Sequence, residues 1–486
     1  MISVSFDDRV QIGLQYILDS LHGCSPFGQE RIRKLRFFAP SEREALETEL
    51  GNTERAAAAA DALKDVYDAI MLELCQIKDV RGSLSRCRAG ETLDHVELFE
   101  IKGYLLRIEA LLPLLTRMQE TVHADGIALH DPASALSVLD PEQTRSRGFY
   151  LPDSLSPRLQ TIRSAKRKIE ERLYAAKTDA EKNAIRIERT RICADEEDEE
   201  RRVRADLCAA LNPYVDELLL DADTLGRLDF LIQKALFAVK YGGVRPAITE
   251  TELVLEEMRN PELCDVLKEK GRAFVPVSIA LDRGATVITG ANMGGKSVAM
   301  KTVALNVLLF HAGFLVCAKR ASMPLFCSVL MLFDEAQSMR SGLSGFGSEI
   351  VAFEKALATV EQGYALFLLD EFARGTNPDE GAAIVTAVTQ YLNGVNAVSV
   401  LSTHYDQVAS AANAHYQIIG LRDVDPDAIR AAVSPDADGI AVIARHMNYG
   451  LYRVEGKSDC PKDALNICRM LSLKPEILDL IEQNYV

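Results

Sequence analysis

The sequence lacks the features that mark secreted, membrane-spanning or zinc-binding proteins. Its ten cysteines form no C-x-x-C pair, so we expect neither a zinc knuckle nor a disulfide framework, and we expect most of them to be buried. The first residues, MISVSFDDRVQIGLQYI, contain no basic leader followed by an apolar core. No window reaches eighteen consecutive apolar residues. These absences predict a soluble, cytoplasmic protein that does not enter a membrane.

The sequence also lacks a positive charge balance. Lys and Arg number 55 against 71 Asp and Glu, which gives a formal net charge of −16. This balance opposes loose adsorption to nucleic acid or to an anionic membrane, although a local basic groove could still exist. Two basic clusters, RIRKLR (31–36) and RSAKRKIEERL (163–173), are either solvated helix faces or contacts for phosphates. A DNA role must therefore be argued from a site.

What the chain does contain is enough apolar sequence for more than one domain. A length of 486 residues is too long for one ordinary domain, and a hydrophobic content of 48% is too high for a disordered chain. The first part reads as helical, and its helix near Leu93 to Leu112 should end or kink at Pro113. We predict three consecutive parts: an all-α core domain over 1–150, lever helices over 151–250, and an α/β domain over 251–486.

The middle part is expected to be a long, rod-like helix. From Pro157 onward Leu159, Ile162, Ile169 and Leu173 recur at helical spacing, which is typical of a seam rather than of a full core face. The segment ERLYAAKTDAEKNAIRIERTR reads as an uninterrupted continuation. Some thirty helical residues span about 45 Å. The dense charges that follow are either a solvated face or a docking patch for a partner.

Short β-branched strands alternate with helices after about residue 275. VPVSIAL and ATVITG are the first two runs, and a helix should begin at Ser297. Continuous apolar strands between helices indicate a mostly parallel sheet covered on both faces. Further strands are expected at 329–333, 365–370 and 397–402, and further helices from Gly347 to about Glu361, from Glu380 to Leu392, and within DALNICRMLSLKPEILDLI.

A glycine-rich motif lies between the strand ATVIT and the helix after it. Residues 290–297, GANMGGKS, fit G-x-x-x-x-G-K-[ST], the phosphate-binding loop of P-loop NTPases. In such a loop backbone N–H groups close around phosphate oxygens, Lys296 bridges the outer phosphates, and the Ser297 hydroxyl ligates Mg²⁺. The residues predicted to bind ATP are Gly290, Ala291, Asn292, Met293, Gly294, Gly295, Lys296, Ser297 and Val298.

Two acids follow a later strand, at the end where ligands of open α/β sheets bind. Asp370 ends ALFLLD and is the candidate contact to Mg²⁺, while Glu371 is placed to orient or deprotonate the attacking water. Alternatively, the two acids only cap a helix. His404 ends the next strand in LSTHYD, and it is either a satisfied polar group or a sensor of the γ-phosphate, the interpretation we prefer.

A Ser/Gly-rich loop, DEAQSMRSGLSGFGSEI, lies between these motifs and opens a helix. It could be an ordinary turn in which Ser344 or Ser348 caps the helix. It could also present N–H groups to the γ-phosphate of a second subunit and so sense ATP across a dimer. The sequence leaves both interpretations open.

The order of the motifs resembles the ATPase domain of the MutS family over about residues 253–480. TGANMGGKS, LSGFGSEI, LLDEFARGTNPDEG and LSTHYD follow one another as they do in that family, whose members resemble ABC-type ATPases and form dimers with composite nucleotide sites. The resemblance implies ATP, Mg²⁺ and a homodimer through the ATPase domains, with Ser344 reaching the other subunit's nucleotide. It also matches Arg374, Gly375 and Thr376 to the loop at the dimer seam, and puts Asn260 where a histidine is usual.

The first half is similar to the core and lever helices of the shorter MutS branch. FFAPSEREALETELGNTERAAAA, DVRGSLSRCRAGETLDHVELFEI and SPRLQTIRSAKRKIEERL carry this likeness. It implies a P-loop ATPase behind an all-α core, without mismatch-recognition, clamp or nuclease-tail domains. The parts of the family that hold DNA are therefore expected to be missing.

Two functions follow from the resemblance. One is an ATPase that remodels a protein partner, as similar clamp-less chains reactivate cobalamin-dependent aminomutases. The other is a DNA clamp of the mismatch-repair or recombination kind. The acidic charge favours the protein partner and predicts weak DNA binding. A scaffold that only binds nucleotide would need a damaged hydrolytic site, yet Asp370 and Glu371 are intact.

Overall fold

The computed structural model describes residues 2–145, 151–290, 295–333, 345–361, 363–421, 446–455, 468 and 473–484. The chain forms two compact units. The sheet unit contains residues 1–21, 35–54 and 234–486, and the helical unit contains residues 22–34 and 55–233. The units thus alternate along the chain, whereas the three consecutive domains expected from the sequence stay a prediction.

The main sheet of the sheet unit has six strands in the order β10-β9-β4-β8-β7-β6. All of them run parallel except β10, which is antiparallel to β9. Both β4 and β8 are buried along their whole length, as in a sheet covered on both faces. The strands are β4 (Gly284–Thr289), β6 (Ser328–Leu332), β7 (Ala365–Asp370), β8 (Ala397–Ser402), β9 (Ala414–Gly420) and β10 (Asn448–Arg453). The predicted bounds of β7 and β8 are confirmed.

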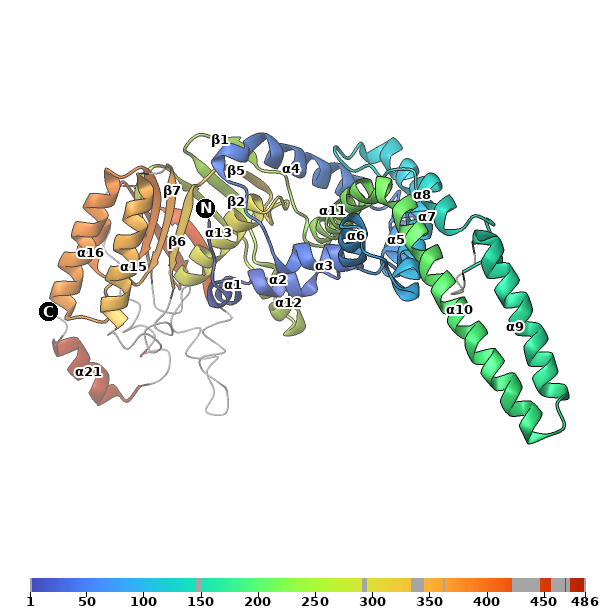
Figure 1. Ribbon diagram of the computed structural model, residues 1–486. Coiled ribbons are helices and arrows are strands. Elements are labelled where there is room, and N and C mark those ends of the chain that lie inside the picture. The colour runs from blue at the N-terminus through green and yellow to red at the C-terminus, as the bar shows by residue number, and fades with distance from the viewer. Residues whose placement is uncertain are drawn as a thin grey trace. The chain divides into compact units, whose positions relative to one another are not determined.

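Helices cover this sheet because they bury apolar faces against it. Phe353 of α15 (Gly345–Val360), Val385 and Leu392 of α16 (Pro378–Asn393) and Val408 of α17 (Asp406–Ala409) join one apolar core with Phe367 and other strand residues. In Figure 1, α15 and α16 lie side by side along the strands. The helix α13 (Lys296–His311) also contacts β7 and β8, and α21 (Pro475–Asn484) is the last described helix.

A second, four-stranded sheet was not expected. Its order is β1-β5-β2-β3, with β1 and β5 parallel and the other pairs antiparallel. The run VPVSIAL supplies β3 and so belongs to this sheet rather than to the sheet of β4. The Tyr416 hydroxyl of β9 donates to the Ala280 carbonyl at 2.9 Å and so links the two sheets. The strands are β1 (Ala247–Thr249), β2 (Leu253–Met258), β3 (Val277–Leu281) and β5 (Arg320–Pro324), and three short helices of this unit are α1 (Phe6–Gln11), α2 (Leu14–Ser20) and α12 (Pro261–Glu269).

The helical unit packs around α7 (His95–Val122). An end or a kink was expected at Pro113; the helix continues through it, so the end is wrong and the kink stays a prediction. Leu111, Leu115 and Met118 are all buried, and their packing on both sides of the proline offsets its cost of about 3 kcal/mol. The other helices are α3 (Pro26–Arg33), α5 (Lys64–Leu74), α6 (Arg81–Arg88), α8 (Ala133–Leu139), α9 (Pro157–Ala175) and α10 (Asp179–Leu211), while α4 (Arg43–Ala58) and α11 (Val215–Tyr241) each contribute residues to both units.

The lever segment is a helical hairpin, not the uninterrupted helix expected from the sequence. The helix α9 ends at Ala175 and α10 begins at Asp179, and the two run side by side (Figure 1). Thr178 is the N-cap of α10, where its hydroxyl accepts from the Glu181 amide while the Glu181 carboxylate accepts from the Thr178 amide. This capping box starts a new helix and so explains the break.

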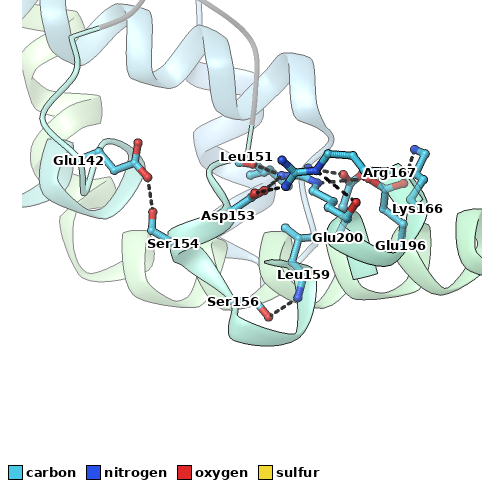
Figure 2. A network of polar contacts seen from close by, with 11 residues as sticks. Glu142, Leu151, Asp153, Ser154, Ser156, Leu159, Lys166, Arg167, Glu196 and Glu200 are labelled. Atoms are coloured by element: carbon cyan, nitrogen blue, oxygen red, sulfur yellow. Dashed lines mark hydrogen bonds and ion pairs between the residues drawn. The ribbon is translucent and has the colours of Figure 1, made fainter. Parts of the chain in front are cut away.

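A buried arginine joins the two helices at the base of the hairpin. Arg163 is 8% exposed, and its guanidinium donates to Asp153 at 2.7 Å, Glu200 at 2.7 Å and Glu196 at 3.2 Å. Figure 2 shows Asp153, Glu196 and Glu200 near one another, with Lys166 bonded to Glu196. The network fixes α9 against α10 and against the segment that precedes α9.

No helix in the described ranges is both long and apolar enough for a membrane crossing.

Candidate nucleotide-binding site

The phosphate loop predicted from the sequence lies at the end of β4. Gly290 and Gly295 both have positive φ, 144° and 93°, which a side chain disfavours. A Cβ on Gly290 would stand 2.9 Å from the Cβ of Ile418 in β9. Gly295 is the N-cap of α13, which begins at Lys296, one residue before the expected Ser297. Ala291, Asn292, Met293 and Gly294 lie outside the described residues.

Lys296 is buried at the first position of α13. It is 4% exposed, its ammonium donates to the Gly290 carbonyl at 2.7 Å, and the Glu371 carboxylate lies 4.0 Å away. Ser297 and Val298 are half-buried in the same helical turn. The N-terminal end of this 16-residue helix carries partial positive charge. The structure therefore brings Lys296 together with Glu371 at a place suited to anions.

The two acids reach this place because β8 lies between β4 and β7. Ser402, the last residue of β8, is in register with Ile288 of β4 on one side and with Asp370 of β7 on the other. The Ser402 hydroxyl donates to the Asp370 carboxylate and accepts from the Glu371 amide at 2.9 Å. Ser402 was missed from the sequence, because strand order cannot be read from it.

Glu371 has an unusual backbone conformation. Its φ is 48°, in the left-handed region that few non-glycine residues occupy and that recurs at functional sites. Its carboxylate accepts from the Arg374 guanidinium at 2.6 Å. Thr376 donates to Glu380 at 3.2 Å, and Gly375 lies between Arg374 and Thr376. The expected place of these last three residues at a dimer seam stays a prediction.

His404 follows β8, one residue after Thr403. Burial lowers its pKa, Lys296 and Arg374 act in the same direction, and Glu371 opposes them. The imidazole is therefore neutral at pH 7 and lies within the electrostatic field of Lys296 and Glu371. Its ring packs against that of Tyr405 with 4.3 Å between the centroids.

The Ser/Gly-rich loop is described only where it enters α15. Ser344 lies outside the described residues. Ser348 lies inside the first turn of a helix that begins at Gly345, so it is not the N-cap. The Glu349 carboxylate of the same turn accepts from the Ala373 amide at 3.0 Å, which links α15 to the loop after Glu371.

A cavity of about 350 Å³ adjoins the start of α13 and was not predicted. Its walls are mostly apolar, and Arg272 is the charged residue among them. They are formed by Leu263, Leu267, Arg272, Ala273, Phe274, Val275, Val277, Gly295, Val298, Ala299, Met447 and Tyr449.

Asn260 does not belong to the cavity wall. It is 3% exposed, caps α12 by accepting from the Leu263 amide at 3.4 Å, and donates to the Ile12 carbonyl at 3.2 Å. Its side chain is thus committed to holding the N-terminal helices against α12.

The candidate ligands for a metal ion are two oxygen donors, the Ser297 hydroxyl and the Asp370 carboxylate. Within the ranges that the structure describes, no three His, Cys, Asp or Glu side chains gather as a metal site. A cation held by the Ser297 hydroxyl and the Asp370 carboxylate would take its other ligands from phosphates and water. This is how Mg²⁺ is usually bound at nucleotide sites, so the residues present fit it.

Comparison with known proteins points to the same region. Residues 286–451 match the family model described as MutS domain V. A DNA mismatch repair protein MutS of Shouchella clausii is 31% identical over 325 residues, 65% of this chain and 35% of that protein. An endonuclease MutS2 of Lactiplantibacillus plantarum is 29% identical over 286 residues, 58% of this chain and 33% of that protein. The chain spans about a third of the length of these curated relatives.

Proposed function

We propose that this chain is an ATPase of the MutS family, which binds ATP with Mg²⁺ between β4 and α13 and hydrolyses it there. The observation that carries the proposal is the convergence of Lys296, Asp370 and Glu371 at one edge of the sheet, through the intervening strand β8. Such an arrangement suits phosphoryl transfer, where catalysis is mostly positioning and charge stabilisation.

Each group then has a definite task. Lys296 donates to the outer phosphates, and the N–H groups at the start of α13 bind phosphate oxygens. Ser297 and Asp370 would hold Mg²⁺, which would neutralise phosphate charge when bound. Glu371 accepts a proton from the attacking water. His404, being neutral, donates one hydrogen bond near the γ-phosphate.

The cavity beside α13 is the proposed place of the nucleoside. Val298 and Ala299 of the phosphate-loop helix line it together with Phe274 and Tyr449. Apolar and aromatic walls bury the faces of a base, which fits the usual make-up of small-molecule sites. The proposal therefore puts the phosphates at Gly290 to Ser297 and the base in this cavity.

We further propose that two copies meet through their ATPase domains, as the family resemblance implies, with Ser344 reaching the nucleotide of the partner. ATP-driven closure of this dimer would then move the helical unit. The coupling suits a protein client, of which a cobalamin-dependent aminomutase is one candidate carried over from the resemblance.

Several cations of the two basic clusters are paired with carboxylates, and this pairing supports a protein client over DNA. In the first cluster, Arg31 pairs with Asp223 at 2.5 Å and Lys34 pairs with Glu30 at 2.6 Å. In the second, Arg163 and Lys166 bond to acids of the same hairpin. Cations already paired with carboxylates gain less from phosphates, so binding that depends on counterion release is weakened.

DNA remains the second candidate because of the relatives' names, which include a mismatch repair protein and an endonuclease. Fluorescence anisotropy with a labelled duplex separates the two. We expect a Kd weaker than about 10⁻⁶ M at physiological salt, the range of non-specific binding. A nanomolar Kd at that salt would make DNA the substrate instead.

ATP binding is tested by calorimetric titration of Lys296→Ala. We expect affinity to fall by about 100-fold or more, because a preorganised donor to the phosphates is removed. Lys301→Ala, five residues further along the same helix, is the control and should bind ATP as the unaltered protein does. Equal affinities of the two variants would refute the assignment of the loop.

A further inference from the structure

Ser402 makes two bonds with one hydroxyl. It is 1% exposed at the end of β8, its Oγ donates to Oδ1 of Asp370, and the same oxygen accepts from the Glu371 amide at 2.9 Å. A serine hydroxyl has one proton to donate and lone pairs to accept. The strand that lies between the phosphate-loop strand and the acidic strand therefore contacts both acids through a single atom.

We propose that Ser402 is a positioning residue, which orients the metal-binding carboxylate of Asp370 and the backbone of Glu371 together. This proposal rests on the proposed ATPase function. A carboxylate can rotate about its Cβ–Cγ bond, and a fixed donor to one oxygen stops that rotation. Groups that orient a metal ligand from behind typically change metal affinity or activity 10–100-fold when removed.

The hydrogen bond from the Glu371 amide to the Ser402 hydroxyl restrains the second acid, Glu371. Glu371 holds a φ of 48°, which costs free energy and persists only where neighbouring groups enforce it. The bond from its amide to Ser402 is one such restraint, and the pairing of Asp370 with Ser402 in the sheet is another. Ser402 thereby ties the carboxylate of Asp370 to the backbone of Glu371.

The same strand offers a matched control. Ser399 is also fully buried in β8, and its hydroxyl has no hydrogen-bond partner within the part of the chain that the structure describes. Ser399→Ala and Ser402→Ala thus remove the same atom from the same strand, once without and once with bonds to the acids. A role confined to packing would make the two variants alike.

The test is the ATPase rate as a function of Mg²⁺ concentration. For Ser402→Ala we expect the half-saturating Mg²⁺ concentration to rise about 10-fold and kcat to fall, while ATP affinity in EDTA changes less than about twofold. Ser399→Ala should match the unaltered protein in all three. Ser402→Thr, which keeps the hydroxyl, should restore most of the Mg²⁺ response.

Several outcomes would overturn the proposal. An unchanged Mg²⁺ response in Ser402→Ala would do so, as would a loss in Ser402→Thr as large as that in Ser402→Ala. If Ser402→Ala does not fold, Ser402→Cys, a weaker donor of similar size, must show an intermediate shift. A failure of the proposed function itself is distinguishable, because the unaltered protein would then hydrolyse no ATP at any Mg²⁺ concentration.

Discussion

Arg163 and Lys296, buried cations from different compact units, are surrounded in different ways. Arg163 of the helical unit donates to three carboxylates and to the Leu151 carbonyl, all within 3.2 Å. Lys296 of the sheet unit donates to a carbonyl of its own glycine-rich loop and has the Glu371 carboxylate at 4.0 Å. Both are nearly inaccessible to water, with 8% and 4% of their surface exposed.

The difference separates a cation that holds structure from one suited to a ligand. The acids around Arg163 come from α10 and from the segment before α9, so their joint capture fixes the hairpin. Lys296 instead stands at a helix N-terminus, next to an acid in a strained backbone conformation. Arg163 and Lys296 are both buried charges. They differ in the backbone nearby, because only Lys296 lies at a helix N-terminus next to a residue with positive φ.

The largest expected effect concerns the acid beside Lys296. Glu371→Gln should lower ATP hydrolysis by about 10²- to 10⁴-fold, because the amide cannot accept the proton of the attacking water. ATP binding should persist and should trap the closed dimer, which a nucleotide-retention assay with size-exclusion chromatography measures. Turnover at the original rate would show that another group is the base.

Arg163→Ala should act on stability instead. Removing one partner of a buried ion network leaves uncompensated acids, and we expect the free energy of unfolding to fall by about 3–5 kcal/mol. Chemical denaturation followed by circular dichroism measures this. Arg167→Ala removes an exposed arginine, 3.4 Å from Asp153, and should cost less than about 1 kcal/mol. Equal losses in the two variants would contradict the role given to Arg163.

A third buried group, His311 of α13, carries no charge. Its ring bonds to the Phe38 carbonyl at 2.9 Å and accepts from the Phe326 amide at 3.1 Å, and burial lowers its pKa to about 4. The unfolded chain, with a His pKa of about 6.5, binds the proton first as pH falls. Stability should therefore be intact above pH 6.5 and decline by about 3 kcal/mol down to pH 4.

Denaturation at stepped pH, compared between the unaltered protein and His311→Gln, isolates this contribution. The variant should lose the part of the pH dependence that lies between pH 6.5 and pH 4. Parallel curves for the two proteins would show that His311 titrates normally.

The smallest effect is expected at the turn of the hairpin. Thr178→Ala removes the cap of α10 and should destabilise its first turn by about 1 kcal/mol. Hydrogen exchange at the start of α10 should accelerate, while Arg163 still holds the base. Thr190→Ala, in the middle of the same helix, is the control and should leave that exchange unchanged. Faster exchange throughout the hairpin would mean that the cap and the base are coupled.

Local patterns predicted the elements that carry the site. The apolar runs of β7 and β8 gave their bounds, and GANMGGKS lies at the strand–helix junction where Lys296 was expected. The capping box of Thr178 and Glu181 was equally readable, but the periodic seam through α9 suggested one helix instead. Pro113 shows the converse, since buried neighbours outweighed a local helix breaker.

Features that depend on distant partners could not be predicted. β3 and β4 are separated by only two residues, yet they belong to different sheets. Ser402 acquires its role only because β8 lies between β4 and β7, and no spacing in the sequence encodes that order. The cavity beside α13 likewise combines Leu263, Phe274 and Tyr449 from separate stretches of the chain.

The alternation of the two units along the chain limits how either could be exchanged in evolution. Residues 1–21 and 35–54 belong with residues 234–486, and Ile12, Leu46 and Leu50 from these early stretches are fully enclosed. A gene fragment encoding only the later stretch would expose the surfaces that these side chains cover. A single recombination crossover therefore cannot transfer the complete sheet unit to another gene. Residues 234–486 must be inherited together with residues 1–21 and 35–54.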